Sequence, residues 1–169
     1  MARQTTLKGN PLDLEGPELK AGDKAPDARV KKSLVDDFRI SEGRGQIRLI
    51  SVVPSLDTPV CAEQTKRFNQ EAASLPNVQF YTVSVDLPPA QTRFCSTAGI
   101  DQNRITVLSD HLDCAFGKAY GTLIPKLRIN SRALFVVDKD DTIRHVEYVK
   151  EVAEHPNYDA ALQALRAIG

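Results

Sequence analysis

The segment 47–53, Ile-Arg-Leu-Ile-Ser-Val-Val, carries the strongest fold signal in this 169-residue chain. It is rich in β-branched residues and largely apolar, which is typical of a strand covered on both faces. Pro54 ends the run, and a segment that opens near Pro59 then places apolar side chains at helical spacing. A doubly covered strand followed by a helix indicates an α/β fold with parallel strands, because parallel neighbours need a crossover connection.

The rest of the chain repeats this alternation of strand and helix. Further strands are predicted at 78–85, 133–138 and 142–149, and helices at 88–99, at 114–120 and after a candidate cap at Asn157. The last two strands are joined by a short polar turn and form an antiparallel hairpin at the edge of the sheet. This order is typical of a thioredoxin-like fold, with a central mixed β-sheet flanked by helices on both faces.

An N-terminal β-hairpin precedes this pattern, because residues 5–14 alternate around Gly9-Asn10-Pro11. No repeat and no long linker divides the chain, so we expect a single domain over residues 1–169. Hydrophobic residues make up 41% and charged residues 26%, as in ordinary globular proteins and unlike disordered chains.

Charge and hydropathy exclude several classes of function. Lys plus Arg and Asp plus Glu both number 22, so nothing favours a nucleic-acid partner. No stretch approaches the ~18 apolar residues of a membrane span, and no apolar run typical of a signal peptide follows Met1. We therefore expect a cytoplasmic protein in a reducing compartment. Its three cysteines are then expected to be free, catalytic or redox-sensing rather than a structural disulfide framework.

Cys61 lies at the predicted junction between a strand and a helix. Thr58 is a good N-cap residue, and Pro59 suits the first helical position. This register makes Cys61 the third helical residue, close to unpaired backbone N–H groups and the positive end of the helix dipole. Such an environment favours a thiolate. Position alone leaves open the alternative that Cys61 is a small buried residue without reactivity.

The spacing Pro54-x-x-x-Thr58-x-x-Cys61 resembles the active-site motif of the peroxiredoxins. The fuller string Pro-Ser-Leu-Asp-Thr-Pro-Val-Cys resembles the thiol peroxidase branch of that family, of the atypical 2-Cys type. Arg-Phe-Cys at 93–95 and Ser-Arg-Ala at 131–133 resemble the same branch, and so does the N-terminal hairpin. The resemblance covers essentially the whole chain.

The resemblance implies a role for each of five residues. Cys61 would be the peroxidatic cysteine, and Cys95 the resolving cysteine of the same chain. Thr58 would hydrogen-bond the thiolate and the peroxide, while Arg132 would favour the thiolate and polarise the peroxide. Pro54 would shield the pocket. From the residues alone, Arg132 is instead interpreted as a surface arginine at a strand end, and the cap role explains Thr58 without any catalysis.

A low thiol pKa is too small an effect to make a peroxidase. A thiol of pKa about 8.5 is a few per cent ionised at pH 7, and lowering the pKa to about 6 gains roughly 30-fold in thiolate. Nucleophilicity falls with the pKa, so the net gain is smaller. Other groups must position the peroxide and stabilise charge as the O–O bond breaks. Thr58 supplies a hydroxyl, and the fixed cation must come from a distant segment.

Cys95 follows Cys61 by 34 positions, which excludes a Cys-x-x-Cys pair and fits no common zinc spacing. With three scattered histidines, no metal site is expected. Cys95 lies within a predicted helix, so we expect that this helix must loosen to deliver the sulfur and that the two cysteines lie apart in the reduced state. Cys114 matches neither motif and is interpreted as a structural or incidental thiol.

By resemblance, the chain is expected to reduce hydrogen peroxide and organic hydroperoxides through a Cys61 sulfenic acid and an intramolecular Cys61–Cys95 disulfide. Thioredoxin or a similar dithiol protein would recycle it. A homodimer is expected, and no haem, flavin or metal cofactor. One rival is a general thiol–disulfide oxidoreductase, which the missing Cys-x-x-Cys argues against. The other is a non-catalytic redox sensor that uses the same disulfide as a switch.

Overall fold

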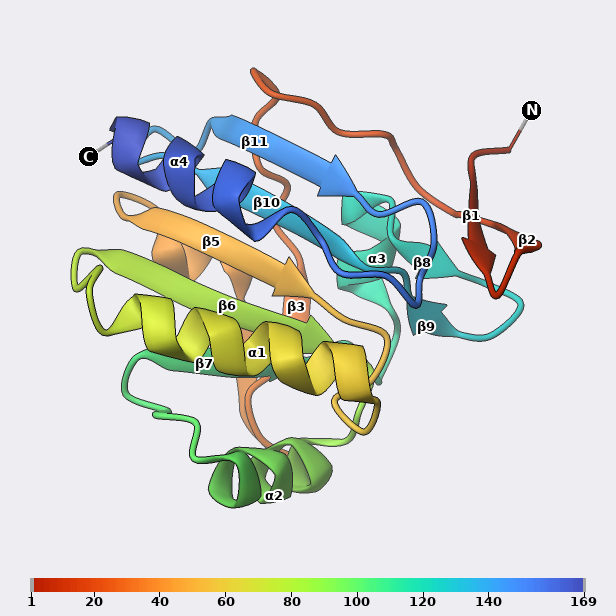
Figure 1. The fold of residues 1–169 in the computed structure, drawn as a ribbon, viewed down its shortest axis with the longest axis horizontal. Coiled ribbons are helices and arrows are strands. Elements are labelled where there is room, and N and C mark those ends of the chain that lie inside the picture. Colours follow the sequence, from red (N-terminus) through yellow and green to blue (C-terminus); the bar gives the residue numbers. More distant parts are fainter. Residues whose placement is uncertain (1, 169) are drawn as a thin grey trace.

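The computed structural model describes residues 2–168, with a seven-stranded mixed sheet at its centre (Figure 1). Its strands are β3 (Arg29–Lys31), β4 (Asp37–Arg39), β5 (Ile47–Val52), β6 (Val78–Ser84), β7 (Ile105–Ser109), β10 (Ala133–Val137) and β11 (Ile143–Tyr148). Their spatial order is β11-β10-β5-β6-β7-β3-β4. β5, β6 and β7 run parallel, and β10 and β11 add the predicted antiparallel hairpin beside β5.

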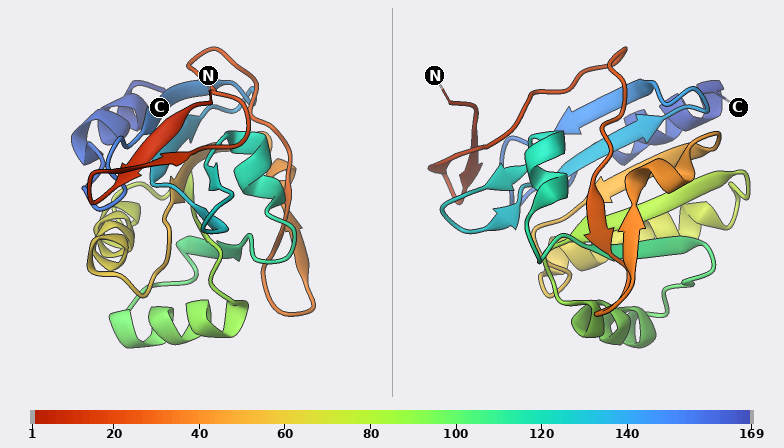
Figure 2. Two further views of the ribbon diagram at one scale, coloured as in Figure 1. Left: turned by 90° about the vertical axis from the view of Figure 1, so that its right-hand side faces the viewer. Right: turned by 180° about the vertical axis from the view of Figure 1, so that it is seen from behind.

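Helices cover both faces of the sheet. α1 (Pro59–Ala72) and α4 (Tyr158–Ile168) lie over one face, and the short α3 (Ala115–Tyr120) lies on the other (Figure 2). α2 (Pro88–Ala98) packs beside β7. The predicted mixed sheet with helices on both faces is therefore confirmed, and so is the cap of α4, because Asn157 Oδ1 accepts the Ala160 N–H at 3.1 Å.

Alternate side chains of β5 enter two separate cores. Leu49 packs with the residues of α1 and α4, including Phe68 and Leu162, whereas Ile50 packs with Phe116 and other residues around α3. Successive side chains of a strand point to opposite faces, so a strand between two helical layers must be apolar at nearly every position. This double coverage explains why residues 47–53 are apolar at all positions except Arg48 and Ser51.

The N-terminal hairpin is confirmed, with a different turn from the predicted one. β1 (Gln4–Leu7) and β2 (Asn10–Asp13) pair antiparallel through a two-residue loop. Lys8 and Gly9 both have positive φ angles, 51° and 80°, as a tight hairpin turn of type I′ requires. Asn10 and Pro11 therefore begin the second strand and do not form the turn.

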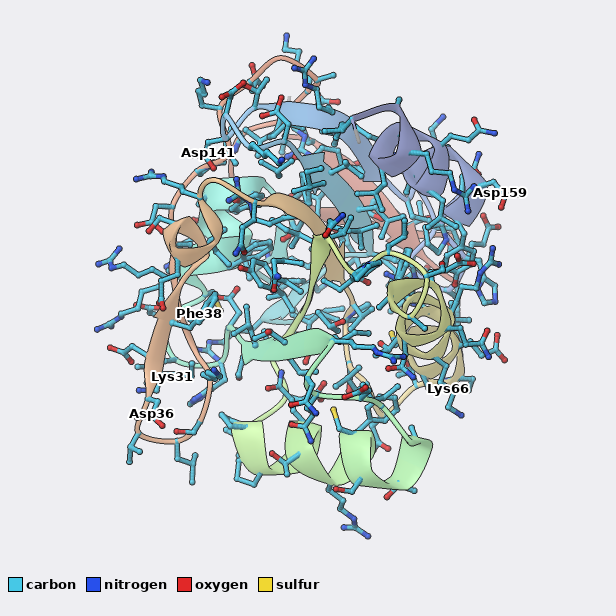
Figure 3. All side chains as sticks on the ribbon, turned by 90° about the vertical axis from the view of Figure 1, so that its left-hand side faces the viewer. Lys31, Asp36, Phe38, Lys66, Asp141 and Asp159 are labelled. Atoms are coloured by element: carbon cyan, nitrogen blue, oxygen red, sulfur yellow. The ribbon has the colours of Figure 1, made fainter. Side chains whose placement is uncertain are left out.

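Several short elements were not predicted. They are the strands β3 and β4 beyond β7, a 3-10 helix at Ile40–Gly43, and the pair β8 (Leu123–Ile124) and β9 (Ile129–Asn130). Strands of two or three residues are too short to display a period of two. Figure 3 shows the β3–β4 hairpin, marked by Lys31, Asp36 and Phe38, on the side of the sheet opposite α1, which Lys66 marks. β7, expected only as a short apolar run, is a full strand beside β6.

Candidate active site

Strand register brings two distant segments together at one end of the sheet. Val52, the last residue of β5, pairs with Ala133, the first residue of β10. Because these strands are antiparallel, the loop after β5 and the residue before β10 lie at the same end of the sheet. Pro54 and Arg132, which are both buried, therefore lie at the same end of the sheet although they are far apart in sequence.

The start of α1 agrees with the predicted register, and Thr58 occupies the predicted N-cap position. Thr58 has an extended backbone (φ −127°, ψ 149°) and Pro59 is the first helical residue. The Thr58 hydroxyl accepts no cap hydrogen bond and instead donates to the carbonyl oxygen of Ser55 at 2.9 Å. Its oxygen keeps lone pairs that can accept a further hydrogen bond. The predicted bond from Thr58 to the Cys61 thiolate and the peroxide stays a prediction.

Cys61 is fully buried in the first turn of α1, in a small apolar cluster with Val53 and Leu56. Partly buried Phe94 and Val107 close this cluster from α2 and β7. A guanidinium nitrogen of Arg132, Nη2, donates to the Cys61 Sγ at 3.3 Å. The sulfur therefore has one polar partner with a permanent positive charge in otherwise apolar surroundings, where charge interactions are stronger than in water.

Arg132 is buried, with 2% of its surface exposed, so its interpretation as a surface arginine is wrong. The backbone carbonyl of Val152 accepts from its Nε at 3.0 Å and from its Nη2 at 2.9 Å. The side-chain oxygen of Gln64 accepts from its Nη1 at 2.9 Å. These bonds hold the planar guanidinium in one orientation, with one edge toward the Cys61 sulfur.

Gln64 is a site residue that sequence reasoning missed. Its side chain is buried, and its Nε2 donates to the Ser51 hydroxyl at 2.7 Å while its oxygen accepts from Arg132. Gln64 follows Cys61 by three residues and therefore lies on the same face of α1. A glutamine on the buried stripe that Cys61 and Phe68 define was the available signal, because a buried amide needs a partner.

Cys95 lies on α2 in the core that also contains α1 and α4, against the residues that surround Phe68, Ile100 and Ile105. It is 1% exposed, and this burial raises the pKa of the Cys95 thiol to about 11. All three cysteines are free thiols in the structure. Cys95 and Cys61 belong to different core clusters, and their approach to form a disulfide stays a prediction.

Cys114 is buried at the start of α3, where it adopts a left-handed backbone conformation with φ of 55°. Burial, the largest effect, raises the pKa of its thiol. The carbonyl of Cys114 accepts a hydrogen bond from the Lys118 N–H at 3.0 Å, within the turn that forms α3. The predicted structural role agrees with this placement and remains a prediction.

A cavity of about 590 Å³ lies between the loop that precedes α1 and the helix α2. It is lined by Ser55, Leu56, Asp57, Asp86, Ala90, Arg93, Phe94 and Thr97.

Among residues 2–168, no group of three or more His, Cys, Asp or Glu side chains is placed to hold a metal ion. None of the helices over the same residues is long and apolar enough to cross a membrane.

The family model for redoxins matches residues 20–162, most of the chain. The chain belongs to the redoxin family. Two relatives that are named thiol peroxidase support an assignment to the thiol peroxidases within that family. The Halalkalibacterium halodurans protein is 51% identical over 162 residues, 96% of each chain, and the Bacillus subtilis protein is 44% identical over 165 residues, 98% of each chain.

Solved structures of redoxin-type proteins share the fold. The crystal structure of a peroxiredoxin-like protein from Aquifex aeolicus matches with a TM-score of 0.91 and 40% identity, over 100% of this chain and 99% of that one. A thiol peroxidase from Chromobacterium violaceum matches with a TM-score of 0.86 at 20% identity, over 97% and 95% of the two chains, which supports the fold. The thioredoxin-like fold is confirmed, and the comparisons support a peroxiredoxin-type peroxidase over a redox sensor.

Proposed function

We propose that the chain reduces hydrogen peroxide and organic hydroperoxides with Cys61 as the nucleophile. The observation that carries this proposal is the buried contact of 3.3 Å between Arg132 Nη2 and Cys61 Sγ. A fixed cation at the sulfur stabilises negative charge there before attack and can hold a peroxide oxygen as the charge moves onto it. This is the pairing of thiol and cation that peroxide reduction needs.

In the first step, the Cys61 thiolate attacks the terminal oxygen of the hydroperoxide. An S–O bond forms and the O–O bond breaks, so sulfur is oxidised to a sulfenic acid while the peroxide is reduced. The leaving oxygen takes up a proton and departs as water or an alcohol. Arg132 would stabilise the charge on that oxygen, Thr58 would hydrogen-bond the peroxide, and Pro54 would shield the pocket from water.

In the second step, the Cys95 thiol condenses with the sulfenic acid of Cys61. An S–S bond forms, the S–O bond breaks, and the hydroxyl leaves as water with the thiol proton. Cys95 is deeply buried within α2, so we propose that α2 must loosen locally before the two sulfurs can meet. The raised pKa of Cys95 is consistent with a thiol that reacts only after this rearrangement.

In the third step, an external dithiol protein reduces the disulfide by exchange, and both cysteines return to thiols. The thiol peroxidase relatives imply peroxide substrates and a reductant of the thioredoxin type. We further propose a reducing, cytoplasmic setting, since such a reductant must be present for turnover. A homodimer is proposed from the family alone, and a single domain over 1–169 stays a prediction.

Peroxide-dependent consumption of NADPH, with thioredoxin and its reductase supplied, tests this cycle. We expect no turnover from Cys61→Ser, because no other thiol lies beside Arg132 among the described residues. Cys95→Ser should form a sulfenic acid once and then stall. Cys114→Ser is the matched control, and its turnover should be close to that of the wild type.

Normal steady turnover from Cys61→Ser would refute the proposal. Reduction of insulin disulfides without peroxide would instead favour a general thiol–disulfide oxidoreductase. A sensor would be oxidised once by one equivalent of peroxide and would show no sustained NADPH consumption, even with the reductant in excess.

A further inference from the structure

The carboxylate of Asp86 accepts hydrogen bonds from the loop that leads to Cys61 and holds this loop in place. Asp86 follows β6, and its Oδ1 accepts a hydrogen bond from the Ser55 hydroxyl at 2.7 Å. Its Oδ2 accepts from the backbone N–H of Leu56 at 2.8 Å. Ser55 in turn holds Thr58, whose hydroxyl donates to the Ser55 carbonyl. Hydrogen bonds to a carboxylate are roughly twice as strong as neutral ones, so this loop is firmly anchored.

The same carboxylate is also joined to α2. The Ser84 hydroxyl donates to Asp86 Oδ2 at 2.7 Å and accepts from the Nε2 of Gln91 at 3.1 Å. Gln91 is buried in the first half of α2, and its Nε2 also donates to the carbonyl of Leu108 at 2.9 Å. Gln91 precedes Cys95 by four residues and lies on the same face of α2.

One continuous chain of hydrogen bonds therefore connects the two segments that the proposed disulfide must bring together. It runs from Ser55 and Leu56 on the Cys61 side, through Asp86 and Ser84, to Gln91 on the Cys95 side. The cavity of about 590 Å³ lies between these segments, and Asp86 is part of its lining. Asp86 links the two segments along the wall of this cavity, and Phe94 of α2 packs against the apolar cluster around Cys61.

We infer that Asp86 is a positioning residue with opposite effects on the two chemical steps, because it holds both segments in the arrangement that suits peroxide attack. By fixing Ser55 it fixes Thr58, so it favours the first step, in which geometry decides the rate. Because Asp86 also holds this loop and the first half of α2 together through hydrogen bonds, it resists the rearrangement that brings Cys95 to Cys61. This inference rests on the proposed cycle of Cys61 and Cys95.

A single-turnover experiment separates the two steps. Reduced protein is mixed with one equivalent of hydrogen peroxide, quenched at intervals, and analysed by intact mass spectrometry for thiol, sulfenic acid and disulfide. Mass detection suits this chain because it contains no tryptophan. For Asp86→Ala we expect sulfenic acid to form about tenfold more slowly and to convert to the disulfide about tenfold faster, as loss of a charged hydrogen-bond hub predicts.

Asp57→Asn is the matched control, because Asp57 lies in the same loop and lines the same cavity, and its carboxylate accepts no hydrogen bond from another described residue. Both of its rates should equal those of the wild type. Asp86→Asn and Ser55→Ala weaken the anchor with less loss of structure, and each should shift both rates in the same directions by a smaller factor. The effects of the two substitutions should be non-additive in the double variant, since both weaken the hydrogen bond between Ser55 and Asp86.

Hydrogen–deuterium exchange supplies a second readout. Asp86→Ala should accelerate exchange in 55–58 and in α2 together, whereas Asp57→Asn should change neither segment. A parallel fall of both rates in Asp86→Ala and Asp86→Asn would show a merely structural role and would overturn the inference. Unchanged rates in both variants would also overturn it. Failure of wild-type protein to form any Cys61–Cys95 disulfide would instead refute the cycle itself.

Discussion

Arg132 shows how a charged side chain can be kept inside an apolar core. Its guanidinium donates to the Val152 carbonyl, to Gln64 and to the Cys61 sulfur, so most of its donors have partners. A buried charge without such partners would be strongly destabilising. The sequence motif pointed to Arg132 only through resemblance, because burial depends on segments that lie far apart in the chain.

Replacing Arg132 should impair the first chemical step far more than it impairs folding. We expect the second-order rate constant for hydrogen peroxide to fall about 10²–10³-fold in Arg132→Met, as for loss of a preorganised donor at a developing charge. Arg132→Lys should lie between this variant and the wild type, since it keeps the charge but loses the planar fork. Competition for limiting peroxide measures the constant. Arg166→Met, at an exposed position of α4, is the control, and a wild-type rate in Arg132→Met would refute this role.

The buried thiol of Cys95 should make stability fall at alkaline pH. Burial raises its pKa from 9.0 to about 11 in the folded protein, so the folded state holds the thiol proton more tightly than the unfolded chain. The resulting stability is complete below about pH 9 and is lost as the pH rises toward about 11. Urea unfolding over this range should show a smaller decline for Cys95→Ser than for wild type. Both proteins contain the same tyrosines, so any contribution of the tyrosines is equal in the two. Equal declines in stability would contradict the assignment of the effect to Cys95.

Among the elements, the N-terminal hairpin supports the site from a distance. Thr6 in β1 forms a parallel bridge to Glu151, with hydrogen bonds from Thr6 N to Lys150 O and from Val152 N to Thr6 O, both of 2.8 Å. The carbonyl of Val152 is the acceptor that orients Arg132. The hairpin thus fixes the backbone segment that orients the Arg132 guanidinium.

Loss of the Glu151 carboxylate should loosen the hairpin. Hydrogen bonds from the Thr6 hydroxyl and from the N–H groups of Lys8 and Gly9 hold the pKa of Glu151 at about 2 in the folded protein. A lowered pKa contributes stability that is present above about pH 4.5 and is lost as the pH falls toward about 2. Acid unfolding of wild type should therefore be steeper in this window than that of Glu151→Gln. Glu154→Gln, at an exposed neighbouring position, should behave as wild type, and identical acid profiles for all three would argue against the anchor.

At the scale of the whole molecule, sequence reasoning predicted what is encoded locally. The doubly covered strands and the register that puts Cys61 third in α1 follow from patterns within a few residues of each feature. The partners of Arg132 and the link from Asp86 to Gln91 could not be predicted in this way. They depend on which strand ends meet in the folded sheet, as in the pairing of Val52 with Ala133.

The chemical state of the cysteines after one equivalent of hydrogen peroxide, mapped by peptide mass spectrometry under non-reducing conditions, tests the proposed mechanism most directly. Wild type should contain one intramolecular disulfide between Cys61 and Cys95, with Cys114 still a free thiol. Cys95→Ser should carry a sulfenic acid on Cys61 that dimedone traps. A disulfide that involves Cys114, or oxidation that leaves Cys61 as a thiol, would contradict the mechanism.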